Sequence, residues 1–281
     1  MPSYLRPQAI EAALEALAVA PRVVLAGGTD YYPARVGRPC DEDILDISGL
    51  SALRGIEEQD DGWRIGALTP WSAIARADLP AWFAGLQLAA REVGGEQIQN
   101  AGTLGGNLCN ASPAADGVPP LLALDAVVEL ASIDRVEHLP LSEFIQGNRR
   151  TARRPDQLLT AVLVPKPEAP RAGGHFLKLG ARRYLVISIV MVGATLEVEP
   201  DGRIARAGIA IGACAPVARR LPEAERALAG ATCGPGLGAR VRPEHLAGLA
   251  PIDDVRASAG YRSDVALTLV RRTLDEMAAR L

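Results

Sequence analysis

Three glycines within five residues, Gly102, Gly105 and Gly106, constrain this chain more than any other feature of its sequence. Glycines at this density let a backbone turn sharply and come close to a ligand. The N–H groups of such a turn attract phosphate, and small polar side chains nearby can hydrogen-bond the ligand. We therefore predict a ligand-binding loop over residues 100–107. The small polar neighbours of the glycines are Thr103, Asn107, Asn110, Ser112 and Asp116.

A second, shorter glycine turn, Gly27-Gly28-Thr29-Asp30, follows the apolar run 22–26. A turn at a strand end is where an open α/β unit binds ligands, and Thr29 and Asp30 can cap a following helix whose positive end favours phosphate. Taken alone, the segment is equally well explained as a tight turn with a helix cap. Together, the two glycine segments predict two clamps on one extended, phosphate-bearing cofactor.

Composition excludes several classes of protein. The chain has 281 residues and a net charge of −3, and it shows no basic stripe of the kind that binds nucleic acid. It contains no apolar run long enough to span a membrane and no secretion signal, so we expect it in the cytoplasm. Its four scattered cysteines do not favour a resident iron–sulfur cluster. For the arginines at 149, 150, 153 and 154, a solvated turn or a contact to another subunit is a better interpretation than an anion site.

Apolar periodicity predicts an α/β start and a β-rich second half. Helices are expected over 8–18, 70–76, 81–93, 119–124 and 257–281, and strands over 22–26, 44–47, 62–67, 126–131 and 158–164. The Pro- and Gly-rich stretch 165–174 marks a domain boundary. Beyond it, strands are expected over 175–180, 189–198 and 204–212, the last two joined by a turn at 200–202.

The sequence contains no self-sufficient catalytic constellation. Its three histidines lack metal-ligand spacing, and it has neither a Gly-x-Ser-x-Gly elbow nor a Gly-Lys-[Ser/Thr] phosphate loop. The glycine segment 102–106 is not the Gly-x-Gly-x-x-Gly of a nicotinamide domain. The chemistry would therefore have to come from a cofactor.

The motifs resemble the flavin-binding subunit of the molybdenum hydroxylases, a family that includes the medium subunit of carbon monoxide dehydrogenase. The matching segments are 4–7, 26–30, 97–107, 110–116, 121–125 and 261–262. The resemblance implies an α+β fold, with a two-part FAD-binding domain of the PCMH (vanillyl-alcohol oxidase-like) type over 1–168, divided into subdomains at about 1–53 and 54–168. It also implies a C-terminal domain over 169–281 with a three-stranded antiparallel sheet and helices.

The same resemblance implies the residues that contact one noncovalent FAD. Two groups would hold the diphosphate from opposite sides: Val24, Leu25, Ala26, Gly27, Gly28, Thr29, Asp30 and Tyr31, and Gly102, Thr103, Gly106 and Asn107. Contacts to the ribityl chain, ribose or adenine side would come from Cys109, Asn110, Ala115 and Asp116. The alternative role for Asp116 is a helix cap. Leu158 and Leu159 would face the adenine. Lys178 would approach the flavin ring; the alternative is a solvated strand lysine. Ile187 would pack near the ring. The segment around it, 184–189, lacks the acid that relatives often carry.

The resemblance also implies a function. The chain would be an electron-transfer subunit that takes electrons from a 2Fe-2S small subunit and passes them through FAD to NAD or another acceptor. A molybdopterin-bearing large subunit would hydroxylate the substrate, and the assembly would be a dimer of heterotrimers. Two alternatives remain open at this point: a standalone flavin oxidoreductase acting on a small substrate, and a flavin-free scaffold subunit.

Overall fold

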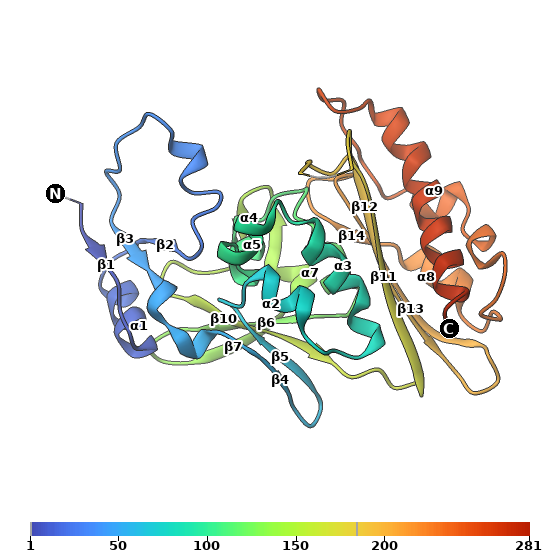
Figure 1. Cartoon of the computed structure of the whole chain (residues 1–281), viewed down its shortest axis with the longest axis horizontal. Coiled ribbons are helices and arrows are strands. Elements are labelled where there is room, and N and C mark those ends of the chain that lie inside the picture. Colours follow the sequence, from blue (N-terminus) through green and yellow to red (C-terminus); the bar gives the residue numbers. More distant parts are fainter. Residues whose placement is uncertain (1, 184) are drawn as a thin grey trace.

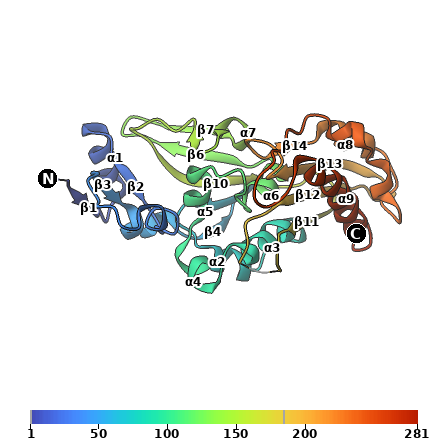
Figure 2. The same ribbon diagram turned by 90° about the horizontal axis from the view of Figure 1, so that it is seen from above.

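The structure, a computed structural model that describes residues 2–183 and 185–281, is elongated, with three parts arranged in chain order (Figure 1). The N-terminal sheet lies at one end and the C-terminal helices at the other, and both views agree on this order (Figure 2). The α-helices are α1 (Ile10–Val19), α2 (Trp71–Arg76), α3 (Ala84–Glu92), α4 (Glu96–Ala101), α5 (Leu104–Asn110), α6 (Val118–Ala123), α7 (Leu141–Phe144), α8 (Pro222–Leu228) and α9 (Ala259–Ala278).

The strands form four sheets within the described residues. Parallel pairing joins β1 (Tyr4–Leu5) and β2 (Val23–Leu25) to β3 (Ile44–Asp46). An antiparallel sheet has the order β4 (Ile56–Glu58), β5 (Gly62–Gly66), β10 (Leu158–Pro165), β6 (Val127–Ala131) and β7 (Val136–Pro140). A small hairpin joins β8 (Ile145–Gly147) to β9 (Arg150–Thr151). The C-terminal sheet runs β11 (Arg171–Leu179), β12 (Val190–Val198), β13 (Ile204–Gly212) and β14 (Arg219–Arg220).

The central strand β10 illustrates how the sequence produces this arrangement. Its apolar run is buried at almost every position, as expected of a strand covered on both faces, and it ends at Pro165, which has no N–H to donate to the sheet. Strands β5 and β6 pair with it on either side. Helix α5 packs near its beginning, so β10 carries Leu158 and Leu159 toward the cavity described below.

The C-terminal sheet is enclosed between helices. Helix α9 buries Ala266, Val270, Leu274 and Met277 against one face, at the spacing of an amphipathic helix. On the other side α6 packs against β12 and β13, and the Thr195 hydroxyl donates to the Ala123 carbonyl at 2.8 Å. The sheet thereby connects the C-terminal helices to the central part of the molecule.

Three local expectations were wrong. The C-terminal sheet has four strands rather than three, because the two-residue strand β14, too short for any apolar pattern, pairs with β13. The expected glycine loop 100–107 is mostly helical, because Thr103 caps α5 and Leu104 and Leu108 are buried. No full helix follows the first glycine turn: only a short 3-10 turn forms at Pro33–Arg35, and no side chain within the described segment caps it.

Candidate functional site

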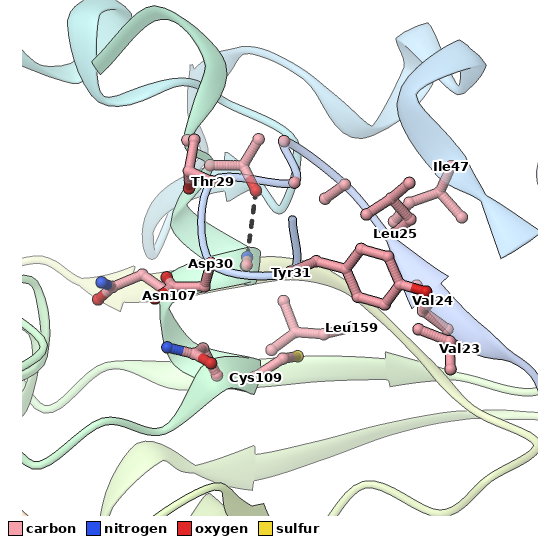
Figure 3. Close-up of a pocket in the computed structure, with 18 of the residues that line it drawn as sticks. Val23, Val24, Leu25, Thr29, Asp30, Tyr31, Ile47, Asn107, Cys109 and Leu159 are labelled. Carbon is pink, nitrogen blue, oxygen red and sulfur yellow. Dashed lines mark hydrogen bonds between the residues drawn. The ribbon is translucent and has the colours of Figure 1, made fainter. Parts of the chain in front are cut away.

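A cavity of about 650 Å³ lies between the N-terminal sheet and helix α5. Such a volume is typical of a small-molecule or cofactor site. Figure 3 shows Asp30 and Tyr31 on one side of this cavity and Cys109 and Leu159 on the other. The expected cofactor residues that line it are Val24, Leu25, Ala26, Gly27, Gly28, Thr29, Asp30, Tyr31, Gly102, Thr103, Gly106, Asn107, Cys109, Asn110, Leu158 and Leu159.

The two glycine segments meet at this cavity. Gly27 lies so close to the end of α4 that a Cβ there would collide with the backbone carbonyl of Ala101. Gly28 has a φ of +70°, in the left-handed region that favours glycine. The two turns therefore lie against each other and together form part of the cavity wall.

Helix α5 continues this wall. The Thr103 hydroxyl accepts a hydrogen bond from the Gly106 N–H at 3.1 Å, which begins the helix one residue later. Gly106 itself borders open space, because a Cβ there would meet only Thr103 Oγ1 closely. The buried Asn107 Oδ1 has no hydrogen-bond partner among the described residues, and a buried polar atom of this kind carries a desolvation cost until something satisfies it.

One end of the cavity is apolar. Val23, Val24 and Leu25 from β2 lie beside Ile47 in Figure 3, and Leu158 and Leu159 from β10 complete the lining there. Cys109 also belongs to this lining, and burial raises the pKa of its thiol to about 11 although the positive charge of Arg153 opposes the shift. The thiol is therefore protonated near neutral pH and contributes as a small apolar group.

Tyr31, which also lines the cavity, is held by charged neighbours. The Arg35 guanidinium lies 3.8 Å from the ring centroid, and Arg35 forms two hydrogen bonds with Glu42, at 3.0 and 2.9 Å. The Tyr31 hydroxyl lies 3.3 Å from Cys40 Sγ and donates to Glu42 at 2.9 Å. The hydrogen bond to Cys40, burial and the Glu42 carboxylate together raise the pKa of Tyr31 above its usual range.

Four expected cofactor residues lie outside the cavity. Lys178 and Asp116 instead form a buried ion pair of 2.7 Å, and the Ser188 hydroxyl donates to the other carboxylate oxygen at 2.7 Å. Burial raises the pKa of Asp116, whereas Lys178 and Ser188 lower it. Lys178 is thus not a solvated strand lysine. Neither residue lines the cavity, and a contact of either one with FAD stays a prediction.

The other two expected cofactor residues, Ala115 and Ile187, also lie outside the cavity lining. Ala115 is buried in the central core. Ile187 is 52% exposed and borders a separate hollow with Leu185, Arg182 and Arg256. Tyr184, in the same sequence segment, lies outside the described residues. A contact between these two residues and FAD stays a prediction.

Several lining residues were missed at the sequence level. Arg22, Arg35, Arg149 and Arg153 bring charge to the cavity, and Trp71, Ile98 and Thr151 also line it. The sequence favoured a solvated turn or a subunit contact for the arginine-rich segment, whereas the structure places Arg149 and Arg153 in the cavity lining. Within residues 2–183 and 185–281, no cluster of His, Cys, Asp and Glu is arranged to hold a metal, and no helix has the length and apolarity needed to cross a membrane.

Comparisons with known proteins identify the class to which this fold and cavity belong. Residues 1–167 match the family described as FAD binding domain in molybdopterin dehydrogenase, and residues 175–277 match the CO dehydrogenase flavoprotein C-terminal domain. The chain therefore belongs to the family of FAD-binding subunits of molybdenum-containing dehydrogenases, which are oxidoreductases.

Similarity to individual proteins extends over nearly the whole chain. The chain is 30% identical to the xanthine dehydrogenase FAD-binding subunit of Escherichia coli O157:H7, covering 99% of this chain and 96% of that protein. It is 33% identical to the nicotinate dehydrogenase FAD-subunit of Eubacterium barkeri over 75% of this chain and 73% of that one. A solved structure of reconstituted CO dehydrogenase from Oligotropha carboxidovorans superposes with a TM-score of 0.88 at 27% identity, covering 100% and 99% of the two chains.

Proposed function

We propose that this chain is the electron-transfer subunit of a molybdenum hydroxylase, carrying one noncovalent FAD in the cavity that its two glycine turns line. Its partners would be a 2Fe-2S small subunit and a large subunit with the molybdenum cofactor, assembled as a dimer of heterotrimers. We further propose a domain boundary near residue 168, a subdomain boundary near residue 53 and a cytoplasmic location. The free state of all four cysteines supports that location, because a reducing compartment maintains thiols.

The observation that carries the proposal is the meeting of two glycine turns at one cavity. Their closely approachable backbones, from Gly27 to Thr29 and from Gly102 to Gly106, suit a diphosphate. The apolar end formed by β2 and β10 suits the adenine, and the Asn107 side chain brings a polar amide to the lining. The residues present therefore fit FAD.

The chemistry that bound FAD supplies is the acceptance of single electrons from an iron–sulfur partner and the release of an electron pair to NAD⁺ or another acceptor. The protein binds and orients the cofactor and excludes water from its apolar end. Cys109 lines the cavity, but its raised pKa keeps the thiol protonated near neutral pH, and a thiol is a far weaker nucleophile than a thiolate. This protonation supports noncovalent attachment.

The test is to purify the full chain and measure flavin absorbance per chain before and after acid precipitation. The proposal expects stoichiometric FAD that is released into the supernatant. Replacing Gly106 by valine would place a branched side chain at the edge of the cavity and should abolish flavin retention, whereas Gly248→Val, at a glycine with no atom near its Cβ position, should retain it. Absence of flavin from the wild-type chain would contradict the proposal.

Co-purification separates the electron-transfer reading from the two alternatives. The proposed subunit should recover an iron–sulfur chain and a molybdenum chain, and alone should show at most electron transfer to artificial acceptors. Turnover of a small organic substrate by the isolated chain would support a standalone oxidoreductase. Partner binding by Gly106→Val without flavin would show that assembly and cofactor binding are separable functions of this chain.

A further inference from the structure

The charged side chains that line the cavity differ in whether a carboxylate compensates their charge. They are Arg22, Arg35, Arg149, Arg153 and Asp30. The charge of Arg35 is compensated by its ion pair with Glu42, 2.7 Å at the closest approach. Arg22 donates to the Ser3 hydroxyl at 2.6 Å, and that hydroxyl donates in turn to the Asp43 carboxylate at 2.6 Å.

Arg149 and Arg153 differ from Arg35, because neither forms an ion pair with a carboxylate in the part of the chain that the structure describes. Arg22 forms no direct ion pair there either, but it lies near enough to Asp43 to lower the pKa of that carboxyl. Arg149 Nη1 donates to the neutral Asn110 Oδ1 at 3.1 Å. Arg153 Nη1 donates to two backbone carbonyls, those of Arg154 at 3.0 Å and Gln157 at 2.6 Å. Each guanidinium is therefore held in place by neutral acceptors while its full positive charge remains uncompensated. A guanidinium carries five N–H donors, so most of the donors on each side chain remain for a ligand.

The two neighbouring arginines, Arg150 and Arg154, do not line the cavity. Arg154 pairs with Glu137 at 2.7 Å and with Asp156 at 3.2 Å and does not line the cavity. Arg150, which is exposed as Arg149 is, does not line the cavity and donates only to the Gln146 carbonyl at 3.2 Å among the hydrogen bonds of the described residues. The hairpin β8–β9 and the turn after it thus direct one arginine of each adjacent pair to the cavity and the other away from it.

The position of the inward pair relates it to the glycine turns. Arg149 is bonded to Asn110, which lies four residues after Gly106 on α5 and therefore about one helical turn away. Cys109 is also on α5, and Arg153 lies near enough to it to lower the pKa of that thiol against the effect of burial. Both arginines therefore line the cavity beside α5, about one helical turn from Gly106 in the expected diphosphate clamp.

We propose that Arg149 and Arg153 are cofactor-anchoring residues that hold the anionic diphosphate of the bound dinucleotide by charge, an inference that rests on the proposed function. The chain as a whole carries a net charge of −3, so a doubly charged ligand gains from a local positive field in the cavity lining. The glycine turns supply close backbone contact without charge. The two arginines supply the charge, and their prior hydrogen bonds hold the guanidinium groups in place before the ligand arrives.

The experiment uses the full chain stripped of flavin and titrated calorimetrically with FAD, ADP and riboflavin. Arg149→Gln and Arg153→Gln should each weaken FAD and ADP binding about tenfold, equivalent to about 1.4 kcal/mol, and leave riboflavin binding unchanged. Added salt should weaken ADP binding to the wild type more than to either variant. Arg150→Gln is the matched control from the same hairpin and should behave as wild type.

Conservative variants separate charge from folding. Arg149→Lys and Arg153→Lys retain the positive charge and should recover most of the salt-dependent affinity, while circular dichroism of each glutamine variant should match that of the wild type. Equal loss of riboflavin and ADP binding in the glutamine variants would indicate local misfolding and would overturn the proposal. Wild-type affinity for FAD and ADP in those variants, with partner subunits no longer co-purifying, would show a subunit contact instead. A wild-type chain that binds no FAD would overturn the proposed function itself.

Discussion

Replacing Lys178 by methionine removes one half of the buried ion pair that joins the C-terminal sheet to the segment before α6. The side chains of Lys178 and Asp116 are 5% and 10% exposed, and their charged atoms lie 2.7 Å apart. Methionine matches the length of the lysine stem, so packing is largely retained. What changes is that Asp116 keeps only the Ser188 hydroxyl as a side-chain partner among the described residues.

Breaking a buried pair in this way costs about 3–5 kcal/mol, because the remaining charge is left uncompensated in a poorly solvated place. The low exposure of both side chains means that solvent screening reduces this figure little. For a chain of this size each kcal/mol lowers the midpoint of thermal unfolding by about 2 °C, so we expect a decrease of about 6–10 °C. Removing both charges together, as Lys178→Met with Asp116→Leu, should restore most of that stability.

The loss should depend on pH in a defined direction. Lys178 lowers the pKa of Asp116, so its removal raises that pKa further above the unfolded value. In the variant the folded state then binds more protons than the unfolded state, and its stability falls as pH rises from the unfolded pKa of about 3.9 through the raised folded pKa. The difference from wild type should therefore be smaller at about pH 5 than at about pH 8.

Urea unfolding followed by circular dichroism, at both pH values and with equal flavin content, measures this difference. Lys178→Met as stable as wild type at both pH values would refute the reasoning, as would a loss of stability that is independent of pH. A double variant no more stable than Lys178→Met would show that the loss comes from packing rather than from the unpaired carboxylate.

Three further outcomes are expected. Gly27→Ala should lose flavin and stability together, since its methyl group would force the two glycine turns apart, whereas Gly248→Ala should have little effect in absorbance and unfolding measurements. Thr103→Ala, which removes the cap of α5, should lower the free energy of unfolding by about 1 kcal/mol, and Thr103→Ser should restore it. Because burial raises the pKa of Cys109 to about 11, iodoacetamide should modify the exposed Cys40 first and Cys109 only at strongly alkaline pH, which peptide mass spectrometry would show; rapid modification of Cys109 at neutral pH would contradict this.

Local sequence determined the elements whose residues carry their own signal. The apolar run of β10, the amphipathic repeat of α9 and the turn between β12 and β13 all form as expected, because near neighbours set the backbone preference and the buried face. The prediction of a loop around the glycine segment 102–106 was wrong, for a physical reason that the structure shows. Each glycine disfavours a helix by about 1 kcal/mol, but the Thr103 cap and the burial of Leu104 and Leu108 outweigh that penalty.

The sequence alone determined that two glycine segments can bring the backbone close to a phosphate-bearing cofactor. It also determined the family to which those motifs belong. Only the tertiary structure decided that the two turns share one wall, that Lys178 is paired with Asp116, and that Arg149 and Arg153 turn inward while Arg150 and Arg154 do not. Local preference acts between residues a few positions apart. Ion pairs and cavity walls join residues tens of positions apart, and their geometry follows from how the sheets and helices pack against one another.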